Sequence, residues 1–116
     1  MTELSDLLTP EAVFAGLGAA NKKTLFQQLG TAAARAYGVD AKLVTERLGE
    51  REKLGSTGFG GGIAIPHGKL EGLDRIYGLA VRLADPVAYK AIDGAPVDLV
   101  FLLLSPPDAG AEVSRR

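Results

Sequence analysis

Cysteine is absent from the sequence, and histidine occurs only once. Without cysteine, the chain has no disulfide framework, no thiolate nucleophile and no zinc–thiolate site. One histidine cannot build a multi-histidine metal site, so we expect no metal ion. A chain without cysteine is compatible with the reducing cytosol.

A strong net charge and a long apolar run are missing as well. Thirteen basic and fourteen acidic residues leave a net charge of −1, which gives no electrostatic reason to bind nucleic acid or an anionic membrane surface. No apolar run reaches the roughly 20 residues that span a bilayer. The N-terminal segment is acidic, whereas a signal peptide begins with basic residues. We therefore expect a cytoplasmic protein that does not insert into membranes.

The chain has the length and composition of one folded domain. Of its 116 residues, 47% are apolar, which favours a packed core over disorder. We find no internal repeat, no low-complexity tract and no linker that would divide the chain. We expect a single domain over residues 1–116.

The first half of the chain predicts one strand and two helices. Asn21 is a suitable N-cap for the first helix, which is expected to end at Gly38. Asp40 can cap the second helix and places Arg51 near its C-terminus. The predicted elements are an apolar strand over 12–17 and helices over 22–37 and 41–52.

The second half of the chain predicts strands. An Asp93–Gly94 turn precedes an apolar segment, and Ser105 with the two prolines after it ends that segment. Because helices lead and strands follow, we expect an α/β fold, an α+β sandwich with a mixed central sheet flanked by helices. The strand over 76–84 is expected to be central and covered on both faces. The predicted strands cover residues 63–65, 76–84 and 97–104.

The single histidine, His67, lies in the stretch GIAIPHGK. Pro66 favours extended backbone before it and Gly68 allows a bend after it, so we expect the ring at the end of a strand. A histidine ring is largely neutral near pH 7 and keeps a nitrogen lone pair for attack. A buried structural histidine is the alternative, and for an isolated histidine beside an apolar run it is the more common case. No sequence spacing ties a serine and an aspartate to His67, so hydrolase chemistry is not indicated.

A glycine cluster, GSTGFGGG, precedes His67 and carries five glycines in eight residues. The dinucleotide fingerprint G-x-G-x-x-G does not fit this cluster, because Ile63 or Ile65 stands where the last glycine is needed. The P-loop pattern does not fit either, because Leu70 stands where a P-loop has Ser or Thr. We therefore do not expect ATP or dinucleotide binding.

The stretch from Arg51 to Lys69, REKLGSTGFGGGIAIPHGK, resembles the active-site signature of the type-2 enzyme IIA domains of the bacterial phosphoenolpyruvate-dependent phosphotransferase system, the mannitol and fructose class. The opening LSDLLTPEAVFAGLGAANKKTLFQQL and the wording LGSTGFG resemble most the nitrogen-related regulatory branch, in which the domain stands alone. The resemblance covers essentially the whole chain, to about Ala111.

The resemblance implies a role for four residues and no metal or organic cofactor. His67 would accept a phosphoryl group from an HPr-type phosphocarrier protein, and Arg51, which matches the family's active-site arginine, would clamp that group. Ser56 and Thr57 would support the phosphate through their hydroxyl groups, with neighbouring glycine amides forming an anion nest. On the residues alone, Arg51 is better explained as a solvated helix end, and the serine and threonine as part of a plain turn.

The resemblance further implies a phosphotransfer regulator, a phosphohistidine carrier rather than a classical turnover enzyme. Its phosphorylated and unphosphorylated forms would bind different targets, such as potassium-transport or stress-response regulators. One alternative is a sugar-uptake component that passes phosphate to a permease IIB domain. A second alternative is a pseudo-domain that binds partners without being phosphorylated.

The C-terminus departs from the family pattern. After SPPDAGAE the family continues with a second histidine, which supports the phosphoryl acceptor, and with two helices that pack over the sheet. Here the chain stops at Val113–Ser114–Arg115–Arg116, so we expect an incomplete domain without the C-terminal helices. The strand over 97–104 is apolar at nearly every position, and we expect its bare face to lower stability or to cause self-association.

Overall fold

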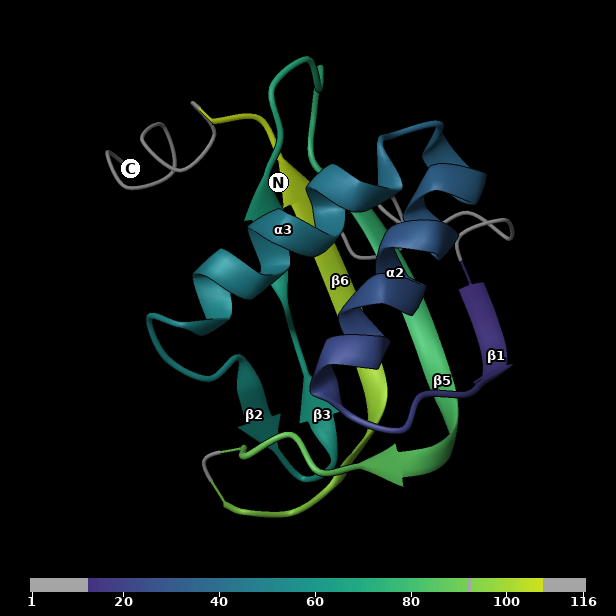
Figure 1. The fold of residues 1–116 in the computed structure, drawn as a ribbon, viewed down its shortest axis with the longest axis vertical. Helices are drawn as coiled ribbons and strands as arrows, with labels where there is room; N and C mark the ends of the chain where they lie inside the picture. Colours follow the sequence, from purple (N-terminus) through teal and green to yellow (C-terminus); the bar gives the residue numbers. More distant parts are fainter. Residues whose placement is uncertain (1–12, 92, 108–116) are drawn as a thin grey trace.

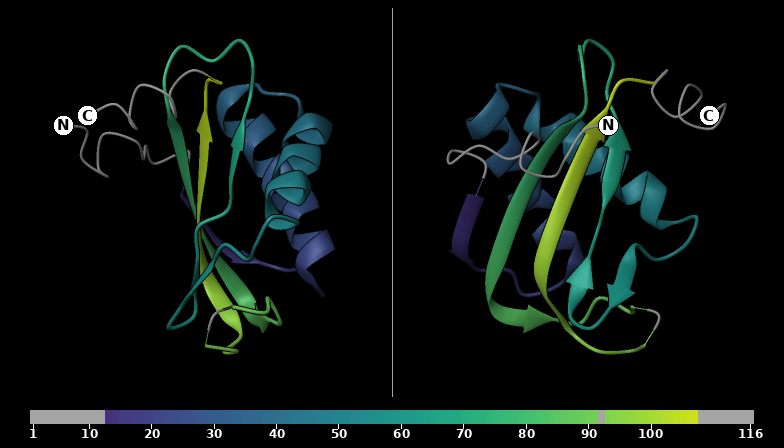
Figure 2. Two further views of the ribbon diagram at one scale, coloured as in Figure 1. Left: turned by 90° about the vertical axis from the view of Figure 1, so that its left-hand side faces the viewer. Right: turned by 180° about the vertical axis from the view of Figure 1, so that it is seen from behind.

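In the part of the chain that the structure describes, a mixed six-stranded sheet carries two helices on one face (Figure 1). The computed structural model describes residues 13–91 and 93–107. Turned by a quarter, the molecule shows both helices on the same side of the sheet (Figure 2). The expected mixed sheet flanked by helices is confirmed. Residue 12 of the first predicted strand lies outside the described residues, and so does the C-terminal segment that departs from the family pattern.

The two long strands, β5 and β6, form the antiparallel centre of the sheet. β1 joins the outer side of β5 in parallel orientation, so the expectation that residues 76–84 form a central strand is confirmed. On the other side of β6, β3 and β4 pair with it in parallel orientation, one after the other. The strands are β1 (Val13–Leu17), β2 (Gly58–Gly60), β3 (Ile63–Ala64), β4 (His67–Lys69), β5 (Tyr77–Val87) and β6 (Val97–Ser105).

The helices α2 (Lys22–Tyr37) and α3 (Ala41–Glu52) have the bounds that their caps predict. The Asn21 side chain accepts a hydrogen bond from the Thr24 amide at 2.8 Å, and Gly38 ends α2 in the left-handed region at φ 73°. The Asp40 carboxylate accepts hydrogen bonds from two amides in the first turn of α3. Local signals thus define both helices.

Gly30, a weak point in the helical pattern, allows the two helices to approach closely. A Cβ atom at this position would lie 2.5 Å from the Ala41 carbonyl oxygen and 2.6 Å from Thr45 Oγ1. Glycine disfavours helix by about 1 kcal/mol relative to alanine, and the close contact between α2 and α3 offsets this cost.

The core lies between the helices and one face of the sheet. Alternate residues of β5 and β6 point into it, as the two-residue period of a strand requires. Within residues 13–91 and 93–107 the helices cover only this face, so the cover that we expected on both faces of residues 76–84 comes from the helices on one face alone. On the face of β6 that we expected to be bare, Leu99, Phe101 and Leu103 are half-buried. Fully buried side chains include Leu25, Leu29, Val44, Leu48, Leu79, Val81, Val100, Leu102 and Leu104.

Candidate functional site

His67 is the first residue of β4, and its side chain is exposed. β3 ends at Ala64, and the chain resumes pairing with β6 only after Pro66, which lacks the amide hydrogen that a ladder needs. The ring therefore starts a strand, which corrects the expectation that it stands at the end of one. Its exposure argues against a buried structural histidine.

The hydrogen bonds of the His67 ring define its tautomer. Nδ1 lies 3.2 Å from the Ile65 carbonyl oxygen, and a carbonyl only accepts hydrogen bonds, so Nδ1 carries the ring hydrogen. Nε2 accepts a hydrogen bond from Arg51 Nε at 3.0 Å. The nitrogen lone pair is therefore on Nε2, on the side of the ring that faces the guanidinium group.

Arg51 reaches His67 from the last turn of α3, and its Nη1 donates a second hydrogen bond to the Gly55 carbonyl oxygen at 2.9 Å. Gly68 brings α3 and β4 together, because a Cβ atom there would lie 3.1 Å from Arg47 Cβ. Its role is this close approach; its φ lies outside the left-handed region that the sharper turns of the chain use. Arg51 and His67, the two residues to which the resemblance assigns the main roles, are thus joined by a hydrogen bond.

A second cluster next to this pair centres on Glu52. Its carboxylate accepts hydrogen bonds from Thr57 Oγ1 at 2.6 Å, from the Thr57 amide at 3.1 Å and from Lys22 Nζ at 2.7 Å. Tyr89, a fully buried residue, places its hydroxyl 2.6 Å from Thr57 Oγ1. Since the carboxylate only accepts, Thr57 donates to Glu52 and Tyr89 donates to Thr57. The cluster fixes the loop after α3, in which Arg51 also has its Gly55 anchor.

The protonation states of this cluster follow from its contacts. Burial raises the pKa of the Glu52 carboxyl, but hydrogen bonds from Lys22 and Thr57 outweigh it, and the pKa lies below its ordinary value. Burial raises the pKa of the Tyr89 phenol, which stays protonated and able to donate. At neutral pH the cluster therefore holds an anionic glutamate and a neutral tyrosine.

Replacing Glu52 with glutamine is expected to lower the free energy of unfolding by about 1–3 kcal/mol at pH 7, because Lys22 and Thr57 lose a charged acceptor. The folded-state pKa of Glu52 is lowered, so its stabilising effect is complete at higher pH and is lost as the pH falls below about 4.3, the ordinary value for glutamate. Urea unfolding between pH 7 and pH 3 should show the difference between wild type and Glu52→Gln shrinking in acid.

The control is Glu50→Gln, since Glu50 makes an exposed ion pair with Arg47 on the same helix. We expect a change below about 0.5 kcal/mol for this variant. A gap between wild type and Glu52→Gln that stays constant down to pH 3 would show that the carboxylate charge does not stabilise the fold.

The structure places the two predicted phosphate-supporting residues differently. Ser56 is exposed, and its Oγ accepts a hydrogen bond from the Gly58 amide at 3.0 Å. Thr57 is buried, and Glu52 holds both its amide and its hydroxyl. Among the described residues, neither side chain hydrogen-bonds to His67. Ser56 thus keeps an accessible hydroxyl, whereas Thr57 contributes to the position of the loop.

The glycines at 60–62 do not surround His67. All three have positive φ, and the Gly61 amide donates to the Asp93 carboxylate at 2.9 Å. Gly62 pairs with Asp98 and Leu99 at the start of β6, whereas His67 lies opposite Leu103. About four residues of strand, roughly 13 Å at 3.3 Å per residue, separate the two places. The glycine run forms the tight turn between β2 and β3.

Sequence reasoning missed Glu52 and Tyr89. Glu52 is the last residue of α3, where the helix dipole disfavours a negative charge. That unfavourable position was the one signal that could have identified a tertiary role for Glu52. Tyr89 gives no such signal, because its contact with Thr57 joins residues 32 positions apart.

Neither a metal cluster nor a membrane span is found in the part of the chain that the structure describes. Within it, no three residues among His, Cys, Asp and Glu lie together as a set of metal ligands. The described helices are too short or too polar to cross a bilayer.

The fold and site define an α/β domain in which an arginine from a helix end holds the lone-pair nitrogen of an exposed histidine. The chain belongs to the family described as "Phosphoenolpyruvate-dependent sugar phosphotransferase system, EIIA 2", which matches residues 6–113. The resemblance of residues 51–69 to the signature of this family is therefore confirmed.

Proteins named nitrogen regulatory protein are similar to this chain. The one from Bradyrhizobium diazoefficiens is 49% identical over 94% of this chain and 71% of its own length. That from Pseudomonas aeruginosa is 43% identical over 97% of this chain and 73% of its own length. The crystal structure of the nitrogen regulatory protein IIA-Ntr from Neisseria meningitidis matches with a TM-score of 0.85 and 38% identity, over 97% of this chain and 77% of that one. The resemblance to the nitrogen-related branch is confirmed.

Proposed function

We propose that the chain is a cytoplasmic phosphohistidine carrier of the nitrogen-regulatory enzyme IIA type. In this proposal, His67 accepts a phosphoryl group on Nε2 from the phosphohistidine of an HPr-type carrier protein. The observation that supports it most directly is the hydrogen bond from Arg51 Nε to His67 Nε2. It supports Nε2 as the nitrogen with the free electron pair, and it brings a cation next to that nitrogen.

The transfer step needs little covalent chemistry from the protein. The Nε2 lone pair attacks the phosphorus atom, the bond from phosphorus to the donor's ring nitrogen breaks, and its electron pair returns to the donor ring. Nδ1 of His67 keeps its hydrogen and donates it in a hydrogen bond to the Ile65 carbonyl oxygen. This hydrogen bond stabilises the positive charge that the ring gains. No proton has to leave the site during the step.

Arg51 has two tasks in this scheme. Before transfer its Nε–H occupies the direction from which phosphorus must approach Nε2, so the guanidinium has to move onto the phosphoryl oxygens as the donor arrives. Its second contact, to the Gly55 carbonyl oxygen, keeps the group close during that movement. Ser56 offers an exposed hydroxyl to the phosphoryl oxygens, and Thr57 supports them indirectly by positioning the loop.

A protein donor fits the surface near the site. Leu54, three residues after Arg51, is 84% exposed, and Phe59 is 71% exposed. Leu54 lies in the loop after α3 and Phe59 in β2, and a partner protein can bury apolar side chains that are exposed to this degree. We expect the donor to cover both side chains when its phosphohistidine meets His67.

The regulatory role is proposed from the names of the similar proteins, which are called nitrogen regulatory proteins. A phosphoryl group adds about two negative charges, enough to reverse the local charge around Arg51. Targets such as potassium-transport or stress-response regulators would then bind one of the two forms, and no sugar permease would be needed.

Incubating the purified chain with phosphoenolpyruvate, enzyme I and an HPr-type carrier tests the proposed function. We expect one phosphoryl group per chain, bound through an acid-labile, alkali-stable linkage. Intact-mass measurement before and after acid treatment gives the result. If the chain gains no phosphoryl group under conditions that label another member of the family, it is not a carrier, and the binding-only alternative holds. Onward transfer to a sugar permease IIB domain would favour the sugar-uptake alternative.

A further inference from the structure

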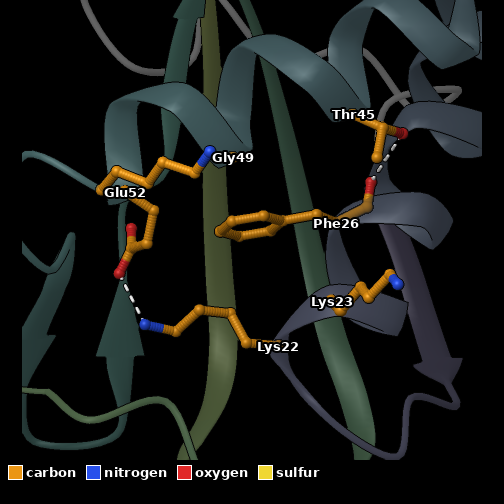
Figure 3. Close-up of a pocket in the computed structure, with 7 residues that line it drawn as sticks. Lys22, Lys23, Phe26, Thr45, Gly49 and Glu52 are labelled. Carbon is orange, nitrogen blue, oxygen red and sulfur yellow. Dashed lines mark hydrogen bonds and ion pairs between the residues drawn. The ribbon is translucent and has the colours of Figure 1, made fainter.

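A groove of about 420 Å³ lies between the start of α2 and the end of α3 (Figure 3). This volume falls in the range of small-molecule sites, about 300–1,000 Å³. The Phe26 ring stands in the middle of the groove, between the Lys22–Glu52 ion pair and Thr45. Phe26 is only 5% exposed, so the groove has an apolar floor. The lining residues are Lys22, Lys23, Phe26, Thr45, Gly49, Glu52 and Lys53.

The charges at the groove do not balance. Three lysines and one glutamate line it, and Glu52 is already paired with Lys22 at 2.7 Å. Lys23 and Lys53 are exposed and make no ion pair with any other described residue. The rim of the groove therefore carries an excess of positive charge over an apolar floor.

The position of two of these lysines adds to the imbalance. Lys22 and Lys23 begin α2, whose first turn holds no acidic residue. A helix N-terminus favours negative charge, so lysines there raise the positive potential that an anion would meet. At the other end, Lys53 also borders a neighbouring hollow with Glu46 and Glu50. An anion is therefore best placed beside the start of α2.

Gly49 lines the groove from α3, and packing does not explain why this helical position is glycine. Apart from its chain neighbours and the backbone of its own helix, a Cβ atom at Gly49 would meet no atom within 4 Å, whereas one at Gly30 would meet the Ala41 carbonyl oxygen at 2.5 Å. Glycine lowers the stability of a helix interior, and at Gly49 no close contact between elements offsets this loss. A side chain at this position would instead reduce the open space in the groove.

We propose that this groove binds a small organic carboxylate with an apolar group. The apolar group lies on the Phe26 ring in the space left by Gly49, and the carboxylate lies beside Lys23 at the start of α2. Lys22 contacts both this site and Glu52, and Glu52 holds Thr57. A ligand in the groove would therefore affect the loop beside Arg51 through Lys22, Glu52 and Thr57. Binding of the ligand itself does not depend on the proposed phosphoryl transfer.

The charge requirement is tested with 3-phenylpropionate and its neutral amide, 3-phenylpropanamide, titrated into the ¹⁵N-labelled full chain. We expect the carboxylate to bind at least tenfold more tightly than the amide and to shift the amide resonances of Lys23, Gly49 and Thr57. Equal affinity for the two probes, or shifts confined to other parts of the chain, would overturn the proposal. So would the absence of a saturable shift up to the solubility limit of the carboxylate.

Two pairs of variants locate the site. Gly49→Leu places a side chain in the open space and is expected to weaken binding of the carboxylate by more than tenfold, while Gly49→Ala, the matched control, retains most of it. Lys23→Gln is expected to weaken carboxylate binding several-fold without changing amide binding. Lys42→Gln, at an exposed position outside the groove, should change neither. Undiminished binding to Gly49→Leu would place the probe elsewhere and refute the site.

Discussion

His67→Ala is expected to abolish phosphorylation of the chain and to leave the fold intact. His67 is the only histidine in the sequence, so no second imidazole can take over the phosphoryl group. Its side chain is exposed and its described hydrogen bonds are those to Arg51 and Ile65. Surface substitutions without packing contacts change stability by about 0.5 kcal/mol or less. Intact-mass labelling and a thermal melt measure the two effects on the same sample.

His67→Gln is the matched control for this prediction. The glutamine side chain offers an oxygen that can accept from Arg51 but has no ring nitrogen to attack phosphorus. We expect it to remain as unlabelled as the alanine variant and to melt within a few degrees of wild type. Residual labelling of either variant would place the phosphoryl group on another residue. Unfolding of both would restore the structural interpretation of the histidine.

The helices could be predicted from the sequence because their limits are set by neighbouring residues. The Asn21 and Asp40 side chains accept from amides two or three residues away, and Gly38 adopts the left-handed conformation that ends α2. Such contacts need only the local sequence. The predicted bounds of both helices agree with those of α2 and α3 because the caps, and not the apolar pattern alone, define where each helix begins and ends.

Strand limits were less predictable because pairing with a distant strand decides them. β5 continues past the predicted end at residue 84 to Val87, which pairs with Val97 across an irregular stretch that contains Pro86. β4 exists as a separate strand because residues 67–69 pair with the end of β6. Neither pairing leaves a mark in the local sequence, since the partners lie 10 or more residues apart.

The site was predictable only in part for the same reason. His67 and Arg51 were identified together through the resemblance, and the structure joins them through Gly68, whose missing side chain lets α3 approach β4. The cluster of Glu52, Thr57 and Tyr89 depends on a contact between distant segments. A carboxylate at the C-terminal end of a helix was its one visible sign.

Arg51→Lys is expected to slow phosphoryl transfer by about 10²–10³-fold, the loss typical for removal of one donor that stabilises transition-state charge. Lysine keeps the positive charge but replaces a planar fork with a single ammonium group. Its one nitrogen would have to serve both the phosphoryl oxygens and the Gly55 carbonyl oxygen, whereas the guanidinium reaches that carbonyl oxygen through Nη1 and keeps its other nitrogens for the phosphoryl group. Because the charge is retained and stability is little affected, the loss should be in the transfer step rather than in folding.

Quenched-flow labelling by the phosphorylated carrier separates this step from docking. We expect the maximal rate at saturating donor to fall, with a smaller change in the donor concentration that gives half of it. Arg47→Lys is the control, because Arg47 lies one turn earlier on α3 and forms an exposed ion pair with Glu50. This control should transfer at the wild-type rate. If Arg51→Lys also transfers at that rate, its fork has no part in stabilising the transferring group, and the hydrogen bond to His67 Nε2 serves only to orient the ring.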